Sequence, residues 1–169
     1  ITDGKLDGTI SAKNPFTHYI DKLKFQEFGD VTLTGAGTVN TKASVGCSIF
    51  VTILDVDDSS LLFPEFITVN MTMSQNGDWD IANDGTFTGK LWNGVLNLDL
   101  STTLAQRGIT GRATLLTFSI DNTLATQSET GTYAYIAKKA AGLQVTPEII
   151  PEPATLLILG LGSWVVRRK

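Results

Sequence analysis

Apolar and polar residues alternate with a period of two along most of this chain. In the segment FITVNMTM at residues 66–73, one face of the chain carries Ile67, Val69, Met71 and Met73. The other face carries Phe66, Thr68, Asn70 and Thr72. Residues 17–28 alternate in the same way and bring Tyr19, Leu23 and Phe25 to one face, although a helix is the alternative for that segment. A side-chain period of two predicts β-strands.

Further strands are expected throughout the chain. The patterns predict them over residues 8–12, 31–39, 43–56, 66–73, 86–92, 95–100, 109–120, 131–137 and 142–145. The run at 43–56 is long, apolar and rich in β-branched residues, so we expect it to be the most buried strand.

Turn signals divide these segments. Asn93-Gly94 readily adopts positive φ and predicts a hairpin between residues 86–92 and 95–100. A second hairpin is predicted at residues 75–78, a turn at residues 83–85, another turn at Gly29-Asp30, and a loop at residues 61–64. Many short strands bounded by turns predict an all-β fold, either an antiparallel sandwich or a jelly roll, followed by a hydrophobic helix.

The last nineteen residues have a different organisation. Pro151-Glu152-Pro153 comes first, an uncharged run from Ala154 to Val166 follows, and Arg167, Arg168 and Lys169 come last. As a helix the uncharged run would be about 20 Å long, shorter than the roughly 30 Å hydrocarbon core of a bilayer. The order predicts a segment that enters a membrane and is stopped by its cations as a temporary anchor. The alternative is an ordinary C-terminal helix packed on the core.

This stretch resembles the PEP-CTERM sorting signal of exported bacterial proteins, a tail also labelled an ice-binding protein C-terminal domain. The Pro-Glu-Pro tripeptide, the helix length, Gly160 and Gly162, and the arginine pair carry the resemblance. It implies that an exosortase-type membrane peptidase recognises the tail and removes it near Pro151-Glu152-Pro153. It also implies a Gram-negative host that makes extracellular polysaccharide. The resemblance concerns sorting and leaves the role of the remaining chain open.

Three regions are therefore expected: an extracellular all-β body at residues 1–146, a linker at 147–153, and a short transmembrane sorting helix with a basic end at 154–169. The protein should be exported and anchored transiently in the membrane. Because the chain starts at Ile1 without a methionine, we expect a signal peptide to precede it or the chain to be truncated.

Charge and cysteine content exclude several classes of protein. The net charge is −4, and removal of the three terminal cations would leave −7, which argues against nucleic-acid binding. Cys47 is the only cysteine, so no disulfide forms within the chain, and its apolar neighbours predict a buried thiol.

The sequence offers little for catalysis. His18 is the only histidine, so any Ser-His-Asp triad would have to use it, and most acidic residues lie beside Gly or Asn in turns. We therefore expect no enzyme, with an exported hydrolase as the least favoured alternative.

Acidic residues gather in two turn regions that are candidates for calcium. Asp78, Asp80 and Asp84 form the better one, because calcium prefers several oxygen ligands on a flexible loop. Asp55, Asp57 and Asp58 form a weaker one. The alternative is that these residues only form turns. No other cofactor is expected.

The predicted function is that of a structural protein of the cell surface or extracellular matrix that self-assembles into oligomers or filaments. Residues 31–39, as an uncharged edge strand, and residues 1–12, as an arm that joins a neighbour's sheet, are the predicted contacts. The alternative is a carbohydrate-binding or adhesive module of the matrix. Trp79, Trp92 and Tyr133 could form its stacking platform for polysaccharide, although isolated aromatic residues in strands more often belong to the core. Either role fits biofilm formation.

Overall fold

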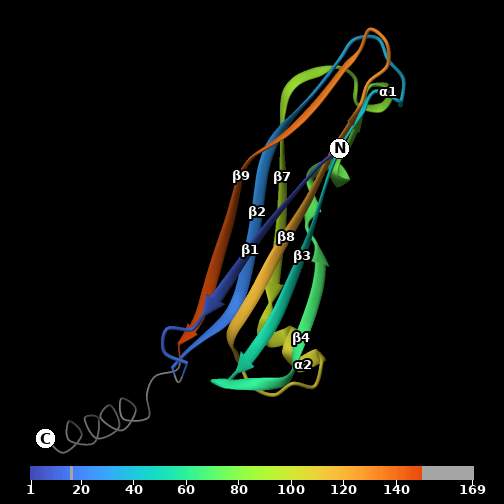
Figure 1. The fold of residues 1–169 in the computed structure, drawn as a ribbon. Coiled ribbons are helices and arrows are strands. Elements are labelled where there is room, and N and C mark those ends of the chain that lie inside the picture. The colour runs from blue at the N-terminus through green and yellow to red at the C-terminus, as the bar shows by residue number, and fades with distance from the viewer. Residues whose placement is uncertain (16, 150–169) are drawn as a thin grey trace, which may run out of the picture.

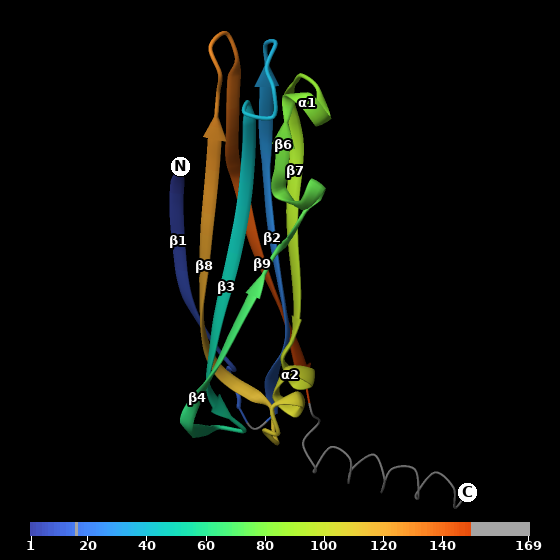
Figure 2. The same cartoon turned by 90° about the vertical axis from the view of Figure 1, so that its right-hand side faces the viewer.

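The computed structural model describes residues 1–15 and 17–149. Two antiparallel sheets face each other and form a tall sandwich (Figures 1 and 2). The strands are β1 (Thr2–Ser11), β2 (His18–Thr34), β3 (Lys42–Val56), β4 (Ser59–Asn70), β5 (Thr72–Met73), β6 (Asp78–Asp80), β7 (Phe87–Asp99), β8 (Ala113–Gln127) and β9 (Tyr133–Ile149). The prediction of an all-β sandwich is confirmed.

We name the two layers the β3 sheet and the β2 sheet after their central strands. The β3 sheet has the order β1-β8-β3-β4, with β6 also pairing with β3, and the β2 sheet has the order β5-β7-β2-β9. Along β3 every second side chain from Ala43 to Ile53 is buried, so one face of the sheet forms the core and the other faces outward. Across the interior, the rings of Phe25 and Phe118 meet edge to face at 5.6 Å.

The predicted turn at Gly29-Asp30 is wrong. β2 runs through both residues without a break, and Gly29 pairs with Trp92 of β7 and with Lys138 of β9. A Cβ on Gly29 would lie 2.4 Å from the Trp92 indole, so the glycine makes room for that ring. Here a glycine marks a close approach inside a strand and not a turn.

The predicted hairpin at Asn93-Gly94 is wrong for the same reason. β7 is one continuous strand, and Gly94 does not adopt positive φ. A Cβ there would lie 2.5 Å from the sulfur atoms of both Met71 and Met73. The glycine therefore leaves space for two methionines that fill the core beside it.

Residues 75–78 connect the two sheets and do not form a hairpin. β5 pairs with β7 in the β2 sheet, and β6 pairs with β3 in the β3 sheet. The 3-10 turn Ser74–Gly77 between them contains Gln75 and Asn76 in left-handed conformations, and the chain passes from one sheet to the other there without reversing its direction, since β4 and β6 are both antiparallel to β3.

Three further local predictions differ from the structure. Residues 61–64 lie within β4 and not in a loop, because an edge strand tolerates Pro64 without a donor. The four-residue helix α1 (Ile81–Asp84) replaces the predicted turn at residues 83–85. The helix α2 (Leu100–Gln106), which the sequence analysis missed, begins where Asp99 accepts a hydrogen bond from Thr102 N, and β8 starts only at Ala113.

The two terminal strands are longer than predicted. β9 unites the segments 131–137 and 142–145 and passes Pro147 to pair Ile149 with His18. The residues 147–149, which the sequence analysis assigns to the linker, therefore lie in the β2 sheet. β1 extends the predicted strand at 8–12 toward the N-terminus and pairs with β8 along its whole length. The predicted sorting helix at 154–169 lies outside the described residues.

The contact between Gly94 and the two methionines generates a test of the fold. Gly94→Ala should lower the free energy of unfolding by about 1–3 kcal/mol, because the added methyl group overpacks the core. Gly46→Ala is the matched control, since a Cβ at Gly46 of β3 meets nothing within 4 Å. Urea unfolding of both variants measures the difference, and equal stability of the two variants would contradict the close packing of Gly94 against the two methionines.

Candidate functional site

A charged pair lies in the interior of the sandwich. Glu27 of β2 is only 1% exposed, and its Oε1 accepts a hydrogen bond of 3.1 Å from Nζ of Lys138 on β9. The other carboxylate oxygen, Oε2, is buried and has no hydrogen-bond partner. A buried carboxylate with one unsatisfied oxygen is costly for the fold, so its presence calls for an explanation.

Two more buried polar groups close to this pair have no partner. Asn122 of β8 is 4% exposed, and neither its amide nitrogen nor its amide oxygen makes a hydrogen bond with the described residues. The Nε1 of Trp92 is also buried and makes no hydrogen bond with the described residues. Asn122 lies directly opposite Cys47 of β3, and both side chains are buried.

Cys47 connects these groups electrostatically. Burial raises the pKa of its thiol to about 12, the negative charge of Glu27 adds to the rise, and the positive charge of Lys138 opposes it. We call Glu27, Cys47, Trp92, Asn122 and Lys138 the core polar cluster. The cluster joins β2, β3, β7, β8 and β9 at one level of the interior.

This cluster is not among the sites predicted from the sequence, although the period of two contains the signal for it. Counting two residues on from Leu23 and Phe25 places Glu27 on the buried face of β2. The same count places Asn122 after Ile120. A polar residue at an inward position of a strand is the feature that would have found the site.

The acidic residues of the predicted calcium site already bind groups of the protein. Asp80 accepts hydrogen bonds of 2.8 Å from the backbone and the side chain of Asn83, and these bonds lower the pKa of its carboxyl. Asp84 accepts from the backbone of Asp80 at 2.9 Å and from the Gln75 amide. Asp78 is exposed on β6.

Over the described ranges, no group of three or more His, Cys, Asp or Glu side chains is arranged to hold a metal ion. Calcium at Asp78, Asp80 and Asp84 would therefore have to displace some of the hydrogen bonds at Asp80 and Asp84, and its binding there stays a prediction. The same holds for the weaker candidate at residues 55–58.

Trp79 and Trp92 belong to the core, as the sequence favours, and do not form the alternative aromatic platform. Trp79 and Trp92 are each 2% exposed, so neither ring is available to a sugar. The Nε1 of Trp79 donates to Oε1 of Gln75 at 2.8 Å. Tyr133 is exposed, and it stacks with Tyr135 of the same strand at 6.4 Å. Trp79 and Trp92 belong to the core because their rings fill the space between the sheets.

The only histidine begins β2. Nδ1 of His18 lies 2.8 Å from Oγ1 of Thr17, its neighbour in the chain. No carboxylate is shown to orient the ring, so the geometry of a catalytic triad is not present at His18 in the described structure.

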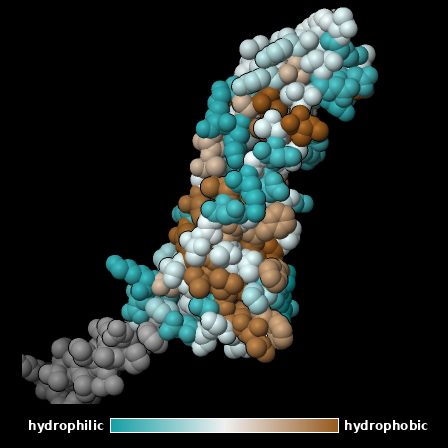
Figure 3. Space-filling model, in the orientation of Figure 1, coloured by the Kyte–Doolittle hydropathy of each residue, from teal (hydrophilic) through white to brown (hydrophobic). Residues whose placement is uncertain are grey.

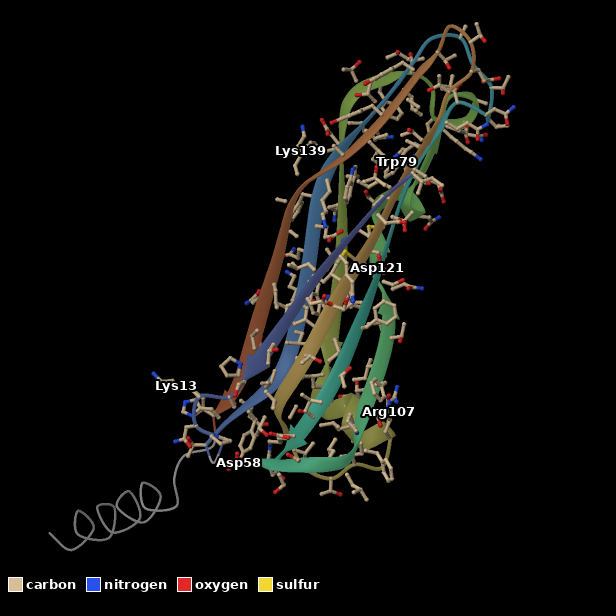
Figure 4. The ribbon with its side chains drawn as sticks, in the orientation of Figure 1. Lys13, Asp58, Trp79, Arg107, Asp121 and Lys139 are labelled. Atoms are coloured by element: carbon tan, nitrogen blue, oxygen red, sulfur yellow. The ribbon has the colours of Figure 1, made fainter. Side chains whose placement is uncertain are left out.

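Two phenylalanines lie on the outer face of the β3 sheet. Phe50 of β3 and Phe66 of β4 are 41% and 67% exposed and are diagonal neighbours, since Phe66 pairs with Thr52. A shallow groove of about 340 Å³ beside Phe50 is lined mainly by Asp7, Thr9, Thr52, Thr117 and Ser119. In the orientation of Figure 1 the surface of the molecule has apolar patches among hydrophilic side chains (Figure 3), and Figure 4 shows the side chains as sticks in the same view.

The raised pKa of the Cys47 thiol predicts how the stability of the fold depends on pH. The unfolded thiol loses its proton near pH 9, whereas the folded thiol keeps it to about pH 12. Between these values the unfolded state binds fewer protons, so stability falls as pH rises. We expect the melting temperature to fall more steeply over this range in the native protein than in Cys47→Ala. Equal slopes in thermal melts of the two proteins would contradict the buried thiol.

Comparison with known proteins gives one match. A family model described as the PEP-CTERM protein-sorting motif matches residues 150–169. No curated protein and no solved structure matches the chain. Within the described part of the chain, no helix has the length and apolar character needed to cross a membrane.

The match coincides with the Pro-Glu-Pro tripeptide, the uncharged run and the basic end seen in the sequence. Such a motif marks exported proteins that an exosortase, itself a membrane protein, processes. The chain is therefore an exported protein that carries a PEP-CTERM sorting motif at residues 150–169.

Proposed function

We propose that this chain is a non-enzymatic structural protein of the cell surface or extracellular matrix, and that copies of it assemble by exchanging β1. The observation that carries the proposal is the weak attachment of β1 to its own core. The sorting motif supports delivery of the protein outside the cell.

β1 is held mainly by its backbone. All ten of its residues pair with β8, from Thr2 opposite Leu124 to Ser11 opposite Leu115. Only Gly8 and Ile10 are even partly buried, and Leu6 is 54% exposed. Since little apolar surface fixes β1, its release costs the core little and uncovers a long edge of β8.

The uncovered edge of β8 can pair with β1 of a second copy in the same way as it pairs with β1 of its own chain. A strand that adds to a sheet gains affinity from main-chain hydrogen bonds, and those bonds are the same whichever copy supplies the strand. The register also places Lys5 opposite Asp121, so opposite charges meet in either case.

The long edge strand of the β2 sheet, β9, is better protected against assembly. β9 carries Lys138 and Lys139 near its middle, and the ladder between β2 and β9 is irregular at Phe28 and Gly29. Lysines and bulges both discourage the addition of a further strand. The segment 31–39, predicted from the sequence as an exposed edge strand, does not offer one, because residues 31–34 belong to β2 between β7 and β9 and residues 35–39 are not in a strand.

Locking β1 to β8 tests the exchange. Thr9 and Thr117 lie directly opposite each other, so Thr9→Cys with Thr117→Cys in a Cys47→Ala background should allow a disulfide between the strands. We expect the oxidised variant to remain monomeric, while the reduced variant and the native protein form oligomers or filaments. Light scattering and electron microscopy measure the size of the assemblies that each protein forms.

The reduced form is the matched control, because it has the same sequence and a free β1. If the oxidised and reduced forms have the same size distribution, β1 exchange is not the route of assembly. A native protein that stays monomeric at high micromolar concentration would contradict assembly altogether.

A second candidate function is the binding of extracellular polysaccharide. Phe50 and Phe66 offer two neighbouring exposed rings beside a groove lined with hydroxyl groups. Aromatic faces and hydroxyl groups together suit a sugar chain, whose rings have apolar faces and polar edges. This surface replaces the buried Trp79 and Trp92 as the candidate platform.

Affinity electrophoresis in gels that contain the host's polysaccharide tests this surface. Phe50→Ala with Phe66→Ala should weaken binding about tenfold, if each ring contributes roughly 0.5–1 kcal/mol of stacking. Leu91→Ala is the control, because Leu91 is 80% exposed and lies on β7 of the opposite sheet. Unretarded migration of the native protein, or equal retardation of both variants, would contradict the candidate.

A further inference from the structure

We propose that Lys138 and Asn122 react within the folded protein to form an isopeptide bond, with Glu27 as the general base. The bond would join the edge strand of the β2 sheet to β8 of the β3 sheet. The inference does not depend on the proposed function, since it concerns a modification inside a single chain.

The topology brings Asn122 and Lys138 to the same level of the interior. β2 and β8 run in the same direction on opposite sides of the sandwich (Figure 2). Phe25 and Phe118 are in contact across the interior, and four residues further along each strand lie Gly29 and Asn122. Gly29 has no side chain and pairs with Lys138, so Asn122 faces the region into which Lys138 extends.

Glu27 is placed to take a proton from Lys138. Its Oε1 lies 3.1 Å from Nζ of Lys138, and only 1% of Glu27 is exposed. The proposed reaction begins with the transfer of one proton from this ammonium to the carboxylate, because only an unprotonated amine can attack a carbonyl carbon. The product is a neutral amine beside a carboxylic acid.

The neutral amine supplies the nucleophile for the next step. The lone pair of Nζ attacks Cγ of Asn122, and the protonated Glu27 donates a hydrogen bond to the oxygen that gains negative charge. The bond between Cγ and Nδ2 then breaks, and Nδ2 leaves with a further proton as ammonia. In balance, a lysine ammonium and an asparagine amide give one secondary amide and one ammonium ion, so no oxidant, reductant or metal takes part.

The reaction accounts for the unsatisfied groups of the core polar cluster. Asn122 has no partner for either amide atom, which suits a reactant better than a group that stabilises the fold. The free Oε2 of Glu27 remains available to the new amide. Cys47 is no competing nucleophile, because its pKa of about 12 keeps the thiol protonated.

A groove next to Lys138 offers a route for ammonia to leave. It has a volume of about 330 Å³ and lies between β8 and β9, where Leu124, Ala125 and Thr126 face residues 134–138. The side chain of Lys138 is 30% exposed, so it spans the distance from this groove to buried Glu27.

Intact-mass spectrometry of the full chain tests the bond. The native protein should weigh less than its sequence by one ammonia molecule, and a protease digest should contain a branched peptide that joins Lys138 to Asn122. Lys138→Arg, Asn122→Ala and Glu27→Gln should each restore the full mass. Lys139→Arg is the matched control and should keep the loss, because Lys139 pairs with Asp30 and not with Glu27.

Other chemistry that removes ammonia gives a different result. A succinimide at an asparagine also loses ammonia, and Asn76-Gly77 and Asn93-Gly94 are prone to it, but that loss would survive Lys138→Arg and give no branched peptide. Circular dichroism shows whether Lys138→Arg folds, and Asn122→Ala serves as the second variant if it does not. A native chain at its full mass once the mass has stopped changing, or a loss that persists in Lys138→Arg, would overturn the proposal.

Discussion

The pairing of Glu27 with Lys138 is the interaction on which the interior of this sandwich depends. It places a carboxylate between two sheets whose other inward positions are mostly apolar, and it ties the edge strand β9 to the middle of the core. A charge in such a position destabilises the fold unless its partner stays in place. The position of Lys138 on β9, and with it the register of β9 on β2, is therefore fixed by more than the backbone ladder.

Glycine explains most of the difference between the predicted and the observed strands. The alternation of side chains correctly predicted the strands and the central position of residues 43–56, because burial of one face is a local property of the sequence. The sequence predicts turns at Gly29 and Gly94, because local preference favours turns at such residues. Both instead receive large side chains from neighbouring strands, Trp92 at Gly29 and two methionines at Gly94. Those contacts are long-range and have no local signature.

The candidate sites also divide into one that adjacent residues reveal and others that depend on contacts between distant strands. The sorting motif is contiguous, so the sequence alone was sufficient to identify it. The core polar cluster combines residues that are 16 to 111 positions apart along five strands, and only the topology brings them together. The exposure of Phe50 and the burial of Trp92 also depend on which face of the strand turns inward. A period of two shows which residues of a strand share a face. It does not show which face is buried when large aromatic residues lie on both.

The order of strands also determines how a pull at the C-terminal end would act on the protein. β9 is an edge strand that leads directly into the sorting motif, and it pairs with β2 from Ile149 back to Tyr133. A force applied beyond Ile149 would act first on the ladder between β9 and β2, because β9 is the strand that continues into the motif. Lys138 lies within β9, so any bond between it and the opposite sheet would stop the separation there. The core polar cluster therefore occupies a position on β9 where a cross-link protects the sandwich from opening.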